Sequence, residues 1–151
     1  MTRKKFFSMI IFCTIFFVAA STSADVQKFE HFSVDVPSGW NAEEKNTELT
    51  IQSQSTDVSI TVSLNQTDEE NLRDIAERFY LNFHGEDFEE DKDGDYTFNF
   101  TNESGDESVA LITGNENYYL VFSITGFDDE NAEKDVQKIL DSIDWYDNKN
   151  K

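Results

Sequence analysis

The sequence has little cysteine, proline, glycine or positive charge. Its 151 residues include one Cys, one Pro, six Gly and 12 Lys or Arg, against 31 Asp or Glu. Cys13 lies in an N-terminal apolar run that we expect to be removed, so disulfides and thiol nucleophiles are excluded from the mature protein. Pro37 marks no linker, and no internal repeat is visible, which favours a single domain.

The shortage of basic residues limits the partners that the chain can bind. Its formal net charge is −19, and all 31 acidic residues lie after residue 24. Such a charge repels phosphate backbones and anionic lipid headgroups, so nucleic acids and membrane surfaces are disfavoured. It favours cations and basic proteins instead.

The one long apolar run, residues 6–20, follows three basic residues and precedes a small-residue segment that ends at Ala24. This pattern predicts a secretory signal peptide over residues 1–24, with cleavage after Ala24 or, as an alternative, after Ala20. A retained membrane anchor is the other interpretation, but a membrane span needs roughly 20 apolar residues. We therefore expect a secreted or periplasmic protein without a membrane span after cleavage.

The mature part, residues 25–151, shows strand and helix periods in turn. Its centre is the hairpin at residues 109–125, in which the run YYLVFSIT is apolar on both faces and predicts a strand in the middle of a covered sheet. Helical spacing predicts one helix that begins with a Thr67–Glu70 capping box and a second that begins at Asp128 or Asp129. The predicted strands lie around residues 29–36, 49–51, 58–64, 96–101, 109–113 and 118–125.

The predicted order is thus three strands, a helix, three strands and a helix. Short connections favour antiparallel neighbours, and each helix can cover one face of the sheet. We therefore predict one α+β domain at residues 25–151: a six-stranded, mainly antiparallel sheet with a helix on each face, which is an α/β/α sandwich.

This order resembles the PsbP-like superfamily, as do the segment FSVDVPSGW at residues 32–40 and the ending KILDSIDW at residues 138–145. The superfamily includes an extrinsic photosystem subunit, a nuclear-import factor that binds a small GTPase, and many small secreted bacterial proteins. The resemblance covers nearly all of the mature chain. It implies a non-enzymatic accessory domain that binds another protein or an envelope component, and it names no partner. An apolar groove beside Tyr118, Tyr119 and Trp145 would favour such a role.

A weak calcium-binding module is the alternative function. Residues 86–95 hold seven acids and one Lys, and Asp91, Asp93 and Asp95 stand at the first three ligand positions of an EF-hand loop. Tyr96 then stands where that loop needs Gly, so this is not an EF-hand. A calcium site with a dissociation constant on the order of 0.1–1 mM stays open. No other cofactor is expected.

Catalytic residues are not expected. His31 and His84 are the two histidines, and neither lies near a G-x-S-x-G turn. The alternation of residues 29–36 predicts that His31 points to solvent, whereas His84 and Gly85 indicate the end of a helix. The sequence therefore predicts a binding protein and not an enzyme, and it leaves the oligomeric state open.

Overall fold

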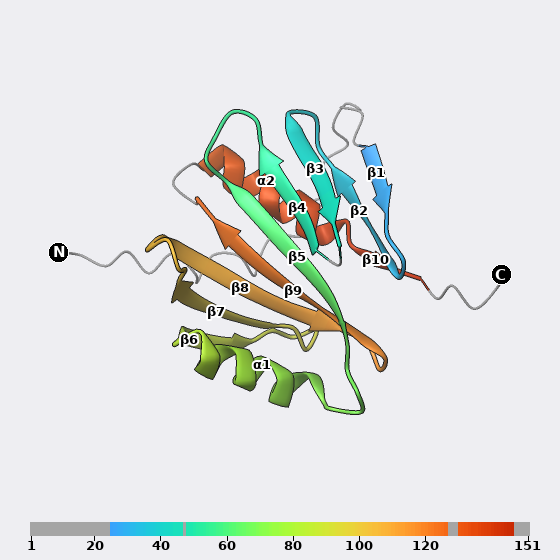
Figure 1. Ribbon diagram of the computed structural model, residues 1–151, viewed down its shortest axis with the longest axis vertical. Helices are drawn as coiled ribbons and strands as arrows, with labels where there is room; N and C mark the ends of the chain where they lie inside the picture. Colours follow the sequence, from blue (N-terminus) through green and yellow to red (C-terminus); the bar gives the residue numbers. More distant parts are fainter. Residues whose placement is uncertain (1–24, 47, 127–129, 147–151) are drawn as a thin grey trace.

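The computed structural model describes residues 25–46, 48–126 and 130–146, which form an α+β domain with two sheets (Figure 1). The predicted signal peptide, residues 1–24, and the predicted helix cap at Asp128 or Asp129 lie outside the described residues. The elements follow in the order β1 (Asp25–Lys28), β2 (Phe32–Val36), β3 (Trp40–Lys45), β4 (Glu48–Ser53), β5 (Ser59–Gln66), α1 (Leu72–Asn82), β6 (Glu86–Glu90), β7 (Tyr96–Thr101), β8 (Glu107–Gly114), β9 (Tyr118–Thr125), α2 (Glu130–Asp141) and β10 (Asp144–Trp145).

The larger sheet has seven strands in the order β3-β4-β5-β9-β8-β7-β6, and all neighbours are antiparallel. β9 lies at its centre, as its apolar run predicts. Leu120 and Phe122 are buried on one face of β9, and Tyr119 and Val121 are buried on the other. The predicted β8–β9 hairpin is confirmed.

The smaller sheet shows that the predicted six-stranded sheet is wrong. Its order is β1-β2-β10, so β2 pairs with strands from both ends of the domain and does not join the larger sheet. The sequence pattern also missed the edge strands β3 and β6. These strands carry acidic side chains such as Glu43 and Glu89, which hide the apolar alternation that marks a strand and which oppose pairing between molecules.

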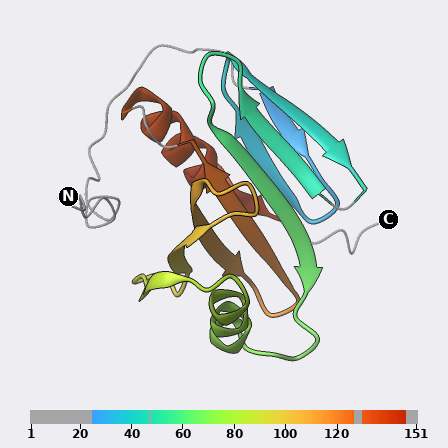
Figure 2. The ribbon, with the colours of Figure 1, turned by 60° about the vertical axis from the view of Figure 1, so that its left-hand side comes forward.

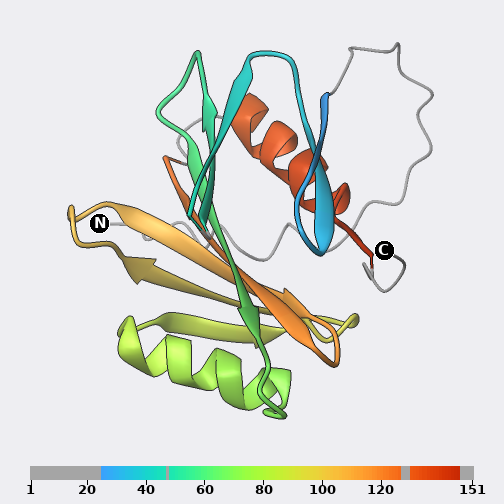
Figure 3. The same ribbon diagram turned by 45° about the vertical axis from the view of Figure 1, so that its right-hand side comes forward.

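Two apolar cores lie on opposite faces of the seven-stranded sheet, because side chains alternate along each strand. The α2-side core joins α2 to β2, β3, β4, β5 and β9, and the α1-side core joins α1 to β7, β8 and β9. Figure 3 shows the two helices on opposite sides of β8 and β9, so the prediction of a helix on each face is confirmed. β1 and β2 lie beside β3 and β4 (Figure 2), and β2 adds to the cover of the α2-side core.

The predicted capping box of α1 is wrong. The N-cap is Asn71, whose side chain accepts a hydrogen bond from the backbone N of Asp74 at 2.9 Å. Thr67 is buried, and its hydroxyl donates to the backbone O of Glu116 at 2.9 Å. Thr67 therefore fixes the end of β5 against the β8–β9 loop.

The end of α2 holds β2 in place. The Ser142 hydroxyl accepts a hydrogen bond from the backbone N of Asp35 at 2.8 Å and donates to the backbone O of Ile139 at 2.7 Å. This contact links β2 to α2, and β2 in turn positions the β1–β2 turn, which lines the cleft described next.

Candidate binding cleft

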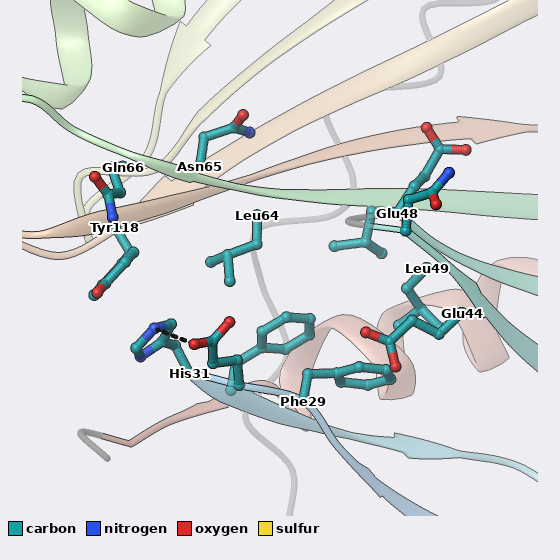
Figure 4. A pocket seen from close by; sticks show the side chains of 13 residues that line it. Phe29, His31, Glu44, Glu48, Leu49, Leu64, Asn65, Gln66 and Tyr118 are labelled. Carbon is teal, nitrogen blue, oxygen red and sulfur yellow. Dashed lines mark ion pairs between the residues drawn. The ribbon is translucent and has the colours of Figure 1, made fainter. Parts of the chain in front are cut away.

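An open cleft of about 280 Å³ lies where the two sheets part, next to the β1–β2 turn (Figure 4). Its thirteen lining residues come from that turn, the β3–β4 hairpin, β5 and the start of β9. They are Phe29, Glu30, His31, Phe32, Glu44, Asn46, Glu48, Leu49, Val62, Leu64, Asn65, Gln66 and Tyr118.

The floor of the cleft is apolar. It consists of two aromatic residues and three aliphatic ones: Phe29, Phe32, Leu49, Val62 and Leu64. The rings of Phe29 and Phe32 are stacked with their centroids 4.9 Å apart. Phe29 and Leu64 are half-buried although they pack against the α2-side core, so the cleft exposes part of that core.

The β1–β2 turn owes its shape to three hydrogen bonds, two between backbone atoms and one from a side chain. The N of Phe29 donates to the O of Phe32 at 2.8 Å, and the N of Tyr146 donates to the O of His31 at 3.0 Å. The Tyr146 hydroxyl donates to the O of Phe29. Tyr146, which directly follows β10, therefore holds the turn that supplies one wall of the cleft.

His31 does not point to solvent, so that prediction is wrong. β2 begins at Phe32, and His31 lies in the turn, where the alternation of the strand does not apply. Its side chain is 15% exposed, and its ring stacks on Tyr118 with a centroid distance of 3.9 Å. In the described part of the chain, His31 Nδ1 is the one buried side-chain polar atom without a hydrogen-bond partner.

An apolar groove beside Tyr118, Tyr119 and Trp145 would favour a binding role, and the structure has it in part. Tyr118 lines the main cleft, and Tyr118 and Trp145 both line a smaller hollow of about 190 Å³ on the other side of His31. Tyr119, in contrast, is buried in the α1-side core. Because neighbouring residues of a strand point to opposite faces, Tyr118 and Tyr119 cannot line the same groove.

The charge at the cleft is negative. Glu30, Glu44 and Glu48 line it, and none of its thirteen described lining residues is Lys or Arg. The carboxylate of Glu44 points into the cleft in Figure 4, and the dashed line marks the 3.9 Å contact between His31 Nε2 and Glu30 Oε1. The cleft thus combines an apolar floor with carboxylates, which suits an apolar chain that carries a positive charge.

The acids proposed for calcium binding lie in a different place, the β6–β7 turn. Asp91 Oδ1 accepts hydrogen bonds from the backbone N of Asp93 at 2.8 Å and of Asp95 at 3.0 Å. Burial raises the pKa of Asp95, a hydrogen bond with Thr113 opposes this change, and the charges of Asp91 and Asp93 add to it. Residues 86–90 form β6, so the acidic loop is shorter than predicted.

No group of three or more His, Cys, Asp or Glu side chains in the described residues is arranged to hold a metal ion.

His84 follows α1 with a φ of 51°, and the N of Gly85 donates to the O of Tyr80 at 2.8 Å, so the predicted helix end is confirmed. In residues 25–46, 48–126 and 130–146, no helix is long and apolar enough to cross a membrane.

Similarity to known proteins is found in the structure and not in the sequence. No protein-family model matches this sequence, and no curated protein matches it. Cyanobacterial PsbP (CyanoP) from Synechocystis sp. is similar in structure, with a TM-score of 0.59 and 15% identity over 87% of this chain and 98% of that chain. A crystal structure from Bacteroides thetaiotaomicron has a TM-score of 0.52 and 17% identity over 80% of this chain and 47% of that chain, so this chain spans about half its length. The predicted PsbP-like fold is therefore confirmed.

Proposed function

We propose that the mature chain is an exported, non-enzymatic accessory domain that binds another protein through the cleft. The observation that carries this proposal is the apolar floor, which stays partly open to solvent between the two sheets. Protein interfaces combine such an apolar centre with a polar rim. Here the rim consists of the glutamates and of Asn46, Asn65 and Gln66.

The chemistry of the lining supports binding over catalysis. No Ser, Thr, Cys or Lys is among the thirteen described lining residues, so a nucleophile of these four types is missing from this cleft. The stack of His31 on Tyr118 uses one face of the imidazole ring for packing. The PsbP-like resemblance implies the same accessory role, and export rests on the predicted signal peptide.

The test compares the mature protein with two variants of β5. Leu64→Asn makes the floor polar, and Thr61→Asn is the matched control because Thr61 lies on the opposite face of the same strand. Each protein is immobilised and exposed to the exported proteins of the source organism. We expect a partner that the wild type and Thr61→Asn retain and Leu64→Asn does not, with all three proteins folded by circular dichroism.

Equal retention by the three proteins would show that the partner binds elsewhere. Sustained hydrolase activity that is lost when one pair of acidic residues is changed would contradict the non-enzymatic role.

A weak calcium site at Asp91, Asp93 and Asp95 is a second candidate function. The observation that favours it is the placement of three carboxylates in one short turn, where Asp91 Oδ1 accepts hydrogen bonds from the backbone N of Asp93 and of Asp95. Burial raises the pKa of Asp95, and the charges of Asp91 and Asp93 add to this rise. Thermal unfolding in calcium or in magnesium, with an Asp93→Asn/Asp95→Asn variant, tests it. A calcium-specific rise in the unfolding midpoint that the variant lacks supports a site, whereas equal small rises with both ions indicate general screening.

A further inference from the structure

We propose that the cleft binds a basic segment of the partner protein, in which one Lys or Arg side chain lies along the apolar floor and places its charge beside Glu44. This inference rests on the proposed function and adds the chemical class of the partner. Four features support it: the position of Glu44, the apolar floor, the size and openness of the cleft, and the charge of the whole chain.

Glu44 is placed to receive a cation. Residues alternate along β3, so Ala42 and Glu44 share one face and Glu43 lies on the other. Glu44 is also the cross-strand partner of Leu49, which is buried in the α2-side core. Its carboxylate therefore lies over apolar side chains (Figure 4), and it forms no ion pair within the described part of the chain. Glu44 is exposed to solvent, so a cation that a partner brings into the cleft can reach its carboxylate and form an ion pair with it.

The floor suits the stem of a basic side chain. Lys and Arg carry three or four methylene groups, which pack on apolar surfaces while the charged end stays near polar groups. Leu49, Val62 and Leu64 supply the aliphatic part of that surface. The stacked rings of Phe29 and Phe32 supply aromatic carbon, on which a cation is also stabilised.

The open shape of the cleft, together with a volume at the lower end of the range for ligand pockets, favours a side chain of a larger partner over a free ligand. Pockets for small molecules usually measure about 300–1,000 Å³ and enclose most of the ligand. This cleft measures about 280 Å³ and is open to solvent. It can hold one long side chain while the backbone of the partner lies outside, where Asn65 and Gln66 offer hydrogen bonds.

The charge of the whole chain supports the same partner. With 31 acidic and 12 basic residues, the surface attracts basic proteins from a distance and speeds their association. Long-range attraction does not select a site, however. The preference for one binding site must come from the cleft. The experiment therefore measures binding at the cleft separately from attraction to the general surface.

The experiment is an amide chemical-shift titration of the mature protein with three seven-residue peptides. They share the sequence Gly-Ser-Ala-X-Ala-Ser-Gly, in which X is Lys, norleucine or Glu. Norleucine keeps the apolar stem of Lys and removes its charge. We expect the Lys peptide to shift the amides of Glu44, Leu64 and Tyr118, the norleucine peptide to bind at least about fivefold more weakly, and the Glu peptide to leave these amides unchanged.

Two charge variants separate the cleft from the general surface. Glu44→Gln is expected to weaken binding of the Lys peptide about fivefold and to abolish its advantage over norleucine. Glu43→Gln is the matched control, because it makes the same change of charge at the next residue on the opposite face of β3. We expect Glu43→Gln to leave the affinity within about twofold at 0.15 M salt, where exposed charges are screened.

Each other result overturns the inference. Equal losses in Glu43→Gln and Glu44→Gln would mean diffuse attraction to an acidic surface. Binding of butylamine as tight as that of the Lys peptide would mean a site for free amines. Preference for norleucine would refute a basic partner, yet it would leave a protein-binding cleft. If no peptide shifts the cleft amides and the captured partner does not depend on Leu64, the proposed function fails as well.

Discussion

The two cores on opposite faces of the seven-stranded sheet predict how two core mutations combine. Ile75 of α1 and Ile139 of α2 are both 0% exposed, and they belong to different cores. Replacing either by Val removes one buried methyl group and is expected to lower the free energy of unfolding by about 0.5–1.5 kcal/mol. Because the sheet separates the two sites, we expect the double variant to lose the sum of the two changes within about 0.5 kcal/mol.

In this double-mutant cycle, replacing Ile by Val is preferable to replacing it by Ala. An Ile→Ala change costs about 2–5 kcal/mol, and two of them approach the total stability of about 5–15 kcal/mol that is usual for a domain. Urea unfolding at pH 7 measures the four proteins, followed by circular dichroism and by the fluorescence of Trp40 and Trp145. The dependence of the unfolding free energy on urea must be the same in all four, since a change in this slope would indicate an altered unfolded state.

A coupling energy above about 1 kcal/mol would refute the separation of the cores, because residues in one packed cluster couple by about 0.5–3 kcal/mol. The comparison pair is Ile60→Val with Ile139→Val. Both residues lie in the α2-side core and are fully buried. This pair is expected to show the larger coupling, and equal coupling in the two cycles would contradict the two-core structure.

Three further changes test local features. Ser142→Ala removes the acceptor of the Asp35 backbone N–H, so we expect a loss of about 1–3 kcal/mol in urea unfolding, and no change would mean that this bond does not anchor β2. Gly94 has a φ of +84° with open space around an added Cβ, so Gly94→Ala should cost about 1–2 kcal/mol of unfolding free energy. Gly126 has a φ of +86°, and an added Cβ would also lie 2.5 Å from the backbone O of Asp57, so Gly126→Ala should cost more. Equal losses would exclude the clash. Asp95→Asn tests the raised pKa of the Asp95 carboxyl group. Burial raises the folded-state pKa of Asp95, so the folded protein binds this proton more tightly and its charged form opposes folding at neutral pH. We therefore expect Asp95→Asn to raise the thermal midpoint at pH 7 and to lose this advantage below the unfolded pKa of about 3.9, and an equal gain at both pH values would contradict this cause.

The sequence predicts best those elements in which the order of apolar and polar residues matches their buried and exposed positions. β9 is apolar on both faces because it is covered on both faces. In β5, Ile60 and Val62 alternate with Ser59 and Thr61 because one face meets the α2-side core. Such patterns are local, so they can be recognised without knowing which strands become neighbours.

Pairing between distant segments leaves no local pattern. β2 pairs with β10, more than a hundred residues further along the chain, and β10 consists of Asp144 and Trp145. Thr67 followed by Glu70 matches a capping box, yet a contact with Glu116 draws Thr67 into the protein and the helix begins later. In both cases, a tertiary contact overrides the local preference.

The cleft escapes sequence analysis for the same physical reason. Each lining residue has an ordinary role when it is considered alone: Phe29 suggests a strand, Leu64 a core position and Glu44 a solvated surface. They meet because β2 lies in a separate sheet, which shares the α2-side core with the larger sheet but parts from it at the β1–β2 turn. In one continuous sheet, hydrogen bonds would hold β2 against its neighbour along its whole length and would close this gap. The departure from the predicted six-stranded sheet therefore creates the candidate site, and the proposed partner would bind the half-buried apolar residues where the two sheets part.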